Sequence, residues 1–281
     1  MRQSLLCCSL TAGVLALASP AAQAATVDGF ELHSSSAGNG GKTIILVHGW
    51  TCDDTSWTKQ VPELAKTFRV VTLDLPGHGR SGSPRDGKFS MDLFARAIEA
   101  VRRESKADKV VLVGHSMGTP VIRQYARLYP QHVAGLVLVD GLVFAPPAAA
   151  GRGAAPPQAS QLTGPEGLKT RENMIKGMFT PATPPAVQQH VLKMMLAAPE
   201  ATANGAMLAT FDASNWKDDV MTLPVLGIYA ENSRLGNPEY SRTIFPALEY
   251  VEVPGTGHFV MMEKPLEFNR LLTAFVNKIT Y

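Results

Sequence analysis

Short apolar runs alternate along most of the chain with segments whose apolar residues recur at helical spacing. The runs predict strands at residues 43–47, 69–73, 110–113, 136–139, 225–229 and 250–253. Ser90 is expected to cap a helix that reaches Val101, and a last helix is expected to follow Pro265. Apolar strands separated by helices predict an α/β fold, a mostly parallel sheet with helices on both faces.

One long segment interrupts this alternation between the strands at 136–139 and 225–229. It begins with a stretch rich in proline, alanine and glycine and continues with helical patterns. These patterns carry Met174, Met178, Met194, Met195 and Met207. A connection of this length inside a compact domain usually has a function or structure of its own. We therefore expect residues 145–216 to form a cap over a site, inserted into a core made of residues 25–144 and 217–281.

The first 24 residues differ in character from the rest. Arg2 precedes an uncharged apolar run over residues 5–18, and the letters AQA follow at 22–24. This order is typical of a secretory signal peptide, and the run is shorter than the ~20 residues that cross a membrane. We expect cleavage after Ala24, no membrane span in the mature chain, and a periplasmic or extracellular location. Cys52 would then be the one cysteine left, without a partner for an intrachain disulfide.

Composition narrows the class of partner. The 281 residues are 45% hydrophobic and 18% charged, with a net charge of +2, which favours a folded globule over a disordered chain. The basic residues form no clustered footprint of the kind that nucleic acid requires, so no nucleic-acid partner is expected. The cysteine spacing matches no zinc site, and we expect neither a metal nor a cofactor. The sequence leaves the oligomeric state open.

The strongest chemical signal is the pattern G-x-S-x-G at residues 114–118, between the apolar strand at 110–113 and a helical segment. A serine on a tight strand-to-helix turn needs a strained backbone, and the flanking glycines let neighbouring chain approach without a clashing Cβ. The turn raises the Ser116 Oγ above the sheet, and the Met117 backbone N–H can then face a developing oxyanion. Ser116 is the predicted nucleophile.

With this motif the chain resembles the α/β-hydrolase family, over nearly all of the predicted mature sequence. Further matches are H-G-W at 48–50, the D-x-x-G-x-G-x-S turn at 74–81 and G-T-G-H-F at 255–259. The resemblance implies that the Trp50 backbone N–H is the second oxyanion donor and that a loop brings His258 back over the serine. It also implies a helical cap between strands 6 and 7 of the family's sheet.

The residues themselves assign similar roles. Serine is a poor nucleophile without a base, and an imidazole has the pKa to accept its proton and return it. His258 lies in a glycine-rich loop after a strand and is the predicted base. His115, inside the G-x-S-x-G turn at 114–118, is expected to point away from the site. The acid must hold the imidazole in the correct tautomer. Asp140, at the end of an apolar strand, is the preferred acid, and Glu231 is the alternative, because the family's usual aspartate would fall near Ser233.

Together these residues predict a secreted serine hydrolase that cleaves a carboxylic ester, or a related acyl bond, through an acyl-enzyme intermediate. The methionines indicate a small, apolar substrate. Two alternatives stay open: the same residues acting on lactones or carbon–carbon bonds or in perhydrolysis, and a non-catalytic binding protein with this fold. The match to G-x-G-x-x-G at 77–82 does not indicate a dinucleotide site, because no helix opens there.

Overall fold

The computed structural model describes residues 25–143 and 161–280 and has a seven-stranded sheet at its centre. The strand order is β3-β5-β4-β6-β7-β8-β9, in which β3 is antiparallel to β5 and the other neighbours are parallel. The strands are β3 (Ser34–Ala37), β4 (Thr43–Val47), β5 (Arg69–Leu73), β6 (Val110–His115), β7 (Val133–Val139), β8 (Val225–Ala230) and β9 (Leu248–Val253). The predicted α/β class is confirmed. The predicted signal peptide lies outside the described residues.

The apolar runs located the parallel strands. β4 and β5 have the predicted bounds, and the four later strands each contain their predicted run and extend beyond it. No apolar run predicted β3, because Ser-Ser-Ser-Ala carries no apolar alternation. This edge strand forms through its pairing with β5, where Ser34 lies opposite Leu73 and Ala37 opposite Val70. A small hairpin of β1 (Thr26–Val27) and β2 (Phe30–Glu31) precedes it.

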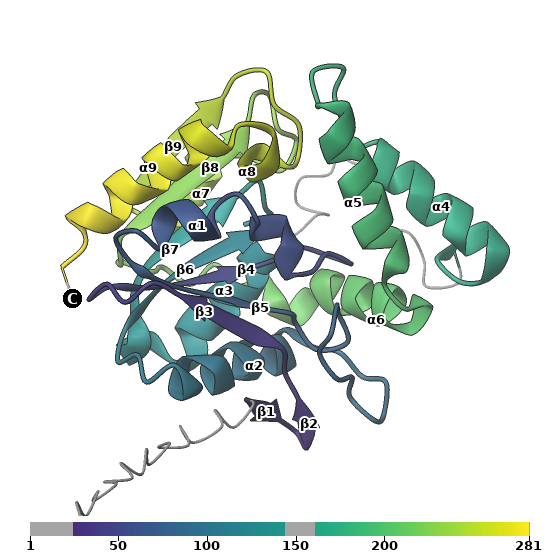
Figure 1. The fold of residues 1–281 in the computed structure, drawn as a ribbon, viewed down its shortest axis with the longest axis horizontal. Coiled ribbons are helices and arrows are strands. Elements are labelled where there is room, and N and C mark those ends of the chain that lie inside the picture. The colour runs from purple at the N-terminus through teal and green to yellow at the C-terminus, as the bar shows by residue number, and fades with distance from the viewer. Residues whose placement is uncertain (1–24, 144–160, 281) are drawn as a thin grey trace, which may run out of the picture.

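Helices cover both faces of the sheet, with α2 and α3 on one side and α1 and α9 on the other (Figure 1). Ser90 caps α2 as predicted, since its Oγ accepts a hydrogen bond from the Leu93 N–H at 3.1 Å. The core helices are α1 (Val61–Leu64), α2 (Met91–Glu104), α3 (Gly118–Leu128), α7 (Pro238–Ile244), α8 (Val260–Glu263) and α9 (Pro265–Lys278). None of the helices in the described ranges is both long and apolar enough to cross a bilayer.

Between β7 and β8, residues 161–224 of the structure include three further α-helices, inside the segment expected to be a cap. They are α4 (Gly164–Lys176), α5 (Pro185–Ala197) and α6 (Glu200–Phe211), and Figure 1 shows them together at one side of the sheet. The proline- and alanine-rich start of this segment, residues 144–160, lies outside the described residues. We call α4, α5 and α6 the insertion helices.

Lys42 joins the two ends of the core. Its ammonium donates to the carbonyl oxygens of Val276, Asn277 and Ile279, at 2.8, 3.2 and 2.6 Å. The last carbonyls of a helix have no partner within the helix, so a cation there satisfies them. Since Lys42 directly precedes β4, this contact fixes the end of α9 at the amino-terminal edge of the parallel strands.

Candidate active site

Ser116 occupies a sharp turn between β6 and α3. Its φ is +53°, in the left-handed region that non-glycine residues rarely adopt, and its N–H donates to the Val139 carbonyl at 2.9 Å. A Cβ on Gly114 would lie 2.4 Å from the Gly118 carbonyl oxygen, and one on Gly118 would lie 2.6 Å from that of Val47. The expected strain at the serine and the close approach at both glycines are therefore confirmed.

His258 and Asp140 meet beside this turn. The His258 Nδ1 lies 2.6 Å from the Asp140 Oδ2, and the Asp140 Oδ1 accepts the Ala230 N–H at 3.0 Å. Burial on its own would raise the pKa of Asp140, whose side chain is 4% exposed. Hydrogen bonds from His258, Ser233 and Ala230 and the charge of the imidazolium outweigh that effect and lower the pKa below its usual value. The carboxylate is therefore held ionised against the ring.

Asp140 and Glu231, the two candidates for the acid, differ in their contact with His258. Asp140 contacts the imidazole, whereas the exposed Glu231 accepts the Gly255 N–H at 3.1 Å through its Oε2. Ser233, near which the family's usual aspartate was expected, lines the cavity beside Asp140 and helps to lower the pKa of its carboxyl. The preferred candidate is the one that the structure brings to His258.

The expected oxyanion donors flank the serine. Trp50 and Met117 line the same cavity as Ser116, and Met117 is the residue that precedes the first turn of α3. Within residues 25–143 and 161–280, neither of their backbone N–H groups donates to a protein acceptor. Across those same residues no hydrogen bond joins the Ser116 Oγ to the His258 ring. Hydrogen bonds of this kind often tighten only when a substrate binds.

A cavity of about 870 Å³ opens above these residues. Ser116, Asp140 and His258 lie in its wall together with both oxyanion candidates. The insertion contributes five large apolar side chains and four polar ones to the wall: Met174, Met178, Phe179, Met207 and Phe211, and Gln161, Thr170, Thr180 and Thr210. The loop after β8 contributes a more polar wall: Glu231, Asn232, Ser233 and Arg234. A concave, mostly apolar site with a few convergent polar groups is typical of small-molecule binding.

His115 was expected to point away from the site, and in the structure it contacts His258. Its Nε2 is 2.9 Å from the His258 carbonyl oxygen, and the two rings are 4.7 Å apart. A carbonyl can only accept, so the His115 Nε2 carries the proton. Burial lowers the pKa of His115 to about 3, which keeps the ring neutral. No pattern in the sequence indicates this contact, because it forms only when the loop at 255–259 folds back against the turn that carries Ser116.

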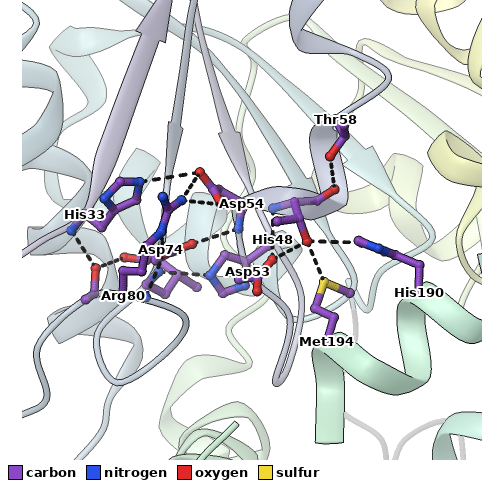
Figure 2. Close-up of polar contacts among 12 residues, drawn as sticks. His33, His48, Asp53, Asp54, Thr58, Asp74, Arg80, His190 and Met194 are labelled. Carbon is purple, nitrogen blue, oxygen red and sulfur yellow. Dashed lines mark hydrogen bonds and ion pairs between the residues drawn. The ribbon is translucent and has the colours of Figure 1, made fainter. Parts of the chain in front are cut away.

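A second polar cluster lies at the end of β5 (Figure 2). Possible metal-binding atoms of His33, Asp54 and Asp74 lie within 4.8 Å of one another. However, the Arg80 Nη2 lies 2.8 and 2.7 Å from the two Asp54 oxygens, and the Arg80 Nε lies 3.5 Å from the Asp74 Oδ2. The Asp74 carboxylate also accepts the backbone N–H groups of Asp54 and Arg80. Arg80 supplies the positive charge, so this cluster holds the turn at 74–81.

Cys52, the one cysteine among the described residues, has no features of a nucleophile. Cys52 is buried and forms no disulfide, and its burial raises the pKa of the thiol to about 12. The thiolate is the reactive form of cysteine, so this side chain serves packing.

Comparison with known proteins agrees with the observed fold. Residues 42–165 match the family described as alpha/beta hydrolase fold. The chain belongs to the α/β-hydrolase family, and its relatives include hydrolases and esterases.

Individual relatives differ in their named activities. The chain is 31% identical to a Pseudomonas putida protein named dihydrolipoyllysine-residue acetyltransferase component of acetoin cleaving system, over 92% of this chain and 70% of that one. It is 28% identical to a solved Thermogutta terrifontis esterase with malate bound, at a TM-score of 0.79 over 91% of this chain and 96% of that one. It is 35% identical to an Edwardsiella ictaluri pimeloyl-[acyl-carrier protein] methyl ester esterase, over 36% of this chain and 37% of that one.

Proposed function

We propose that this protein is a serine hydrolase that cleaves carboxylic esters through an acyl-enzyme intermediate. The observation that carries the proposal is the 2.6 Å contact between the His258 Nδ1 and the Asp140 Oδ2 at the cavity that Ser116 lines. A carboxylate that accepts the Nδ1 proton leaves the Nε2 of the neutral ring as the acceptor. His258 is thereby prepared to take the serine proton.

In the acylation step, the Ser116 Oγ attacks the ester carbonyl carbon while the His258 Nε2 takes the hydroxyl proton. The carbonyl oxygen becomes an oxyanion that the backbone N–H groups of Trp50 and Met117 stabilise, and Asp140 stabilises the imidazolium. Collapse of the tetrahedral intermediate breaks the bond to the alcohol oxygen. That oxygen leaves with the proton from His258, and the acyl group remains on Ser116.

Deacylation repeats the sequence with water. His258 takes a proton from a water molecule, whose oxygen attacks the acyl carbon within the same oxyanion site. The second tetrahedral intermediate expels the Ser116 oxygen, which recovers its proton from His258. The products are a carboxylic acid and the regenerated enzyme.

The proposed substrates are small esters with an apolar acyl or alcohol group. The methionines and phenylalanines that the insertion contributes to the cavity support this choice, because methionine side chains adapt to different apolar shapes. The esterases among the relatives support ester chemistry. Lactones present the same carbonyl, so they belong in the substrate panel.

Labelling with a fluorophosphonate tests the reaction class. We expect wild-type protein to be labelled at Ser116, as located by mass spectrometry of the digested protein, and to hydrolyse p-nitrophenyl esters of graded acyl length. Ser116→Ala should lose both the label and the turnover. Folded wild-type protein that stays unlabelled and inactive would instead be a non-catalytic binding protein with this fold.

We also propose that the protein is exported, on the basis of the composition of residues 1–24. Expression of the full chain in a bacterial host, followed by fractionation and N-terminal sequencing, tests this. The expected product begins at Ala25 in the periplasm or medium. Retention of Met1 in the cytoplasmic fraction would contradict it.

A further inference from the structure

Trp50 connects the core to the insertion. Its indole Nε1 donates to the carbonyl oxygen of Ala203 in α6 at 2.7 Å, and the side chain is buried. Its backbone N–H is one of the two proposed oxyanion donors. The same residue therefore contacts an insertion helix with its side chain and the reaction site with its main chain.

The turn that carries Trp50 has a strained backbone. The Cys52 N–H donates to the Gly49 carbonyl at 3.2 Å, which closes a turn around Trp50 and Thr51. Thr51 has a φ of +54°, a conformation that a β-branched residue adopts only at a cost. Such a conformation persists only where the surroundings fix it. The direction of the Trp50 N–H therefore depends on contacts made by the turn with its neighbours.

Contacts on two sides fix this turn. On the core side, the His48 Nε2 accepts the Leu75 N–H at 2.9 Å, so its Nδ1 carries the proton and donates to the Gly49 carbonyl at 2.8 Å. Burial lowers the pKa of His48 to about 4, which preserves this arrangement near neutral pH. On the other side, the indole of Trp50 provides the contact with α6.

The insertion is itself firmly attached where it meets Trp50. The Thr202 Oγ1 donates to the Gly77 carbonyl at 2.9 Å, one residue before Ala203. Farther along the core loop, the Thr55 Oγ1 lies 3.1 Å from the Nε2 of His190 in α5. The Ala203 carbonyl is therefore a fixed acceptor.

We infer that the Trp50 indole is a positioning group: its bond to α6 holds the Trp50 backbone N–H in the direction that oxyanion stabilisation needs. In that case α6 contributes to oxyanion stabilisation in addition to covering the catalytic site. This inference rests on the proposed ester hydrolysis.

Trp50→Phe tests it, because phenylalanine keeps an aromatic ring and removes the donor. The Ala203 carbonyl still has its partner within α6, so the change leaves no buried acceptor unpaired. Complete loss of an oxyanion donor costs about 10²–10³ in kcat, and a misdirected donor loses part of that. We expect kcat on a p-nitrophenyl ester to fall about tenfold, with KM within about twofold.

An inhibitor distinguishes a misplaced oxyanion donor from a general loss of structure in the variant. A trifluoromethyl ketone forms a tetrahedral oxyanion with the active serine, so its affinity should fall by the same factor as kcat. The matched control is Trp57→Phe. Trp57 is fully buried and outside the cavity, and its Nε1 has no hydrogen-bond partner in the part of the chain that the structure describes. This control should lower the melting temperature about as much as Trp50→Phe and leave kcat within about twofold.

Thr202→Val tests how α6 is held, since it removes the bond from Thr202 to Gly77 beside Ala203. We expect a smaller loss of kcat than in Trp50→Phe, because the indole bond to Ala203 remains. The inference is overturned if Trp50→Phe keeps the wild-type kcat, if only KM changes, or if Trp57→Phe or Thr202→Val lowers kcat as much as Trp50→Phe does. Wild-type protein that fluorophosphonate does not label would overturn the proposed function instead, so the two failures are distinguishable.

Discussion

Two buried aspartates occupy equivalent places in this fold and serve different purposes. Asp74 directly follows β5 and Asp140 directly follows β7, and their exposed fractions are 0% and 3%. The two oxygens of each carboxylate bind different partners: the Asp54 and Arg80 N–H groups for Asp74, and the Ala230 N–H and the His258 ring for Asp140. In the sequence, each is an aspartate at the end of an apolar strand.

Their partners distinguish them. Asp74 binds backbone N–H groups and lies beside the Arg80 guanidinium, all of which keep their protons at any ordinary pH. Gly79 folds over it so closely that a Cβ there would lie 2.4 Å from the carboxylate. Asp140 instead borders the cavity and binds an imidazole, which can gain and lose a proton near neutral pH. In both places the strand end provides a buried carboxylate. Its partner determines whether that carboxylate holds a turn or, in the mechanism proposed above, supports proton transfer.

The largest expected effect is on Asp140. Asp140→Asn cannot stabilise the imidazolium or hold the productive tautomer, so kcat on a p-nitrophenyl ester should fall by about 10³–10⁴. Initial rates measured beside circular dichroism spectra check this. Glu231→Gln is the control and should stay within about threefold, because Glu231 contacts Gly255 and not the imidazole. Equal, small losses in both variants would remove both residues as the acid.

Substitution of Asp74 is expected to lower the stability of the fold. Asp74→Asn replaces a charged acceptor of two backbone N–H groups, and we expect the free energy of unfolding to fall by about 2–3 kcal/mol. Urea unfolding at pH 7 measures the change. The folded fraction should keep a kcat within about threefold of wild type. A stable Asp74→Asn protein that loses activity as completely as Asp140→Asn would contradict the division between the two carboxylates.

The third effect concerns the buried histidines near each aspartate, and it arises only below about pH 6.5, where histidines of the unfolded chain bind protons. Burial lowers the pKa of His48 to about 4 and the pKa values of His78 and His115 to about 3. The unfolded chain binds protons at these residues near pH 6.5, and the folded chain does not. Stability should therefore fall as pH drops from 6.5 toward 4, by up to about 1.4 kcal/mol per pH unit for each histidine.

His78→Gln sharpens this prediction, because it removes one such group from the turn that contains Asp74. Urea unfolding at pH 7, 6 and 5 should give a shallower dependence for the variant than for wild type. An unchanged slope would mean that His78 is protonated in the folded protein.

Local sequence pattern was enough to predict much of this fold. β4 is buried at all five positions, so its apolar run marked its bounds. The turn at 114–118 was predictable because both the strain at Ser116 and the close approach of Gly114 to Gly118 arise within five residues. β3 was not, because a run of serines becomes a strand only through its pairing with β5.

The site was less predictable where it depends on distant segments. The sequence left Asp140 and Glu231 as alternatives, because Asp140 lies 118 positions from His258 and only the folded chain brings the two together. The contacts of His115 with His258 and of Trp50 with Ala203 join segments 143 and 153 residues apart. No periodicity or motif encodes such pairs, because they require the sheet order and the insertion to be in place.

The bond from Lys42 to the end of α9 has a practical consequence. Parallel strands place their carboxyl ends at one edge, where Ser116 and Asp140 lie, and Lys42 precedes the amino end of β4 at the opposite edge. Chain attached beyond Ile279 therefore leaves from the side away from the cavity mouth. For immobilisation on a resin or fusion to a reporter, a linker at that end is the natural choice, since it leaves substrate access unobstructed.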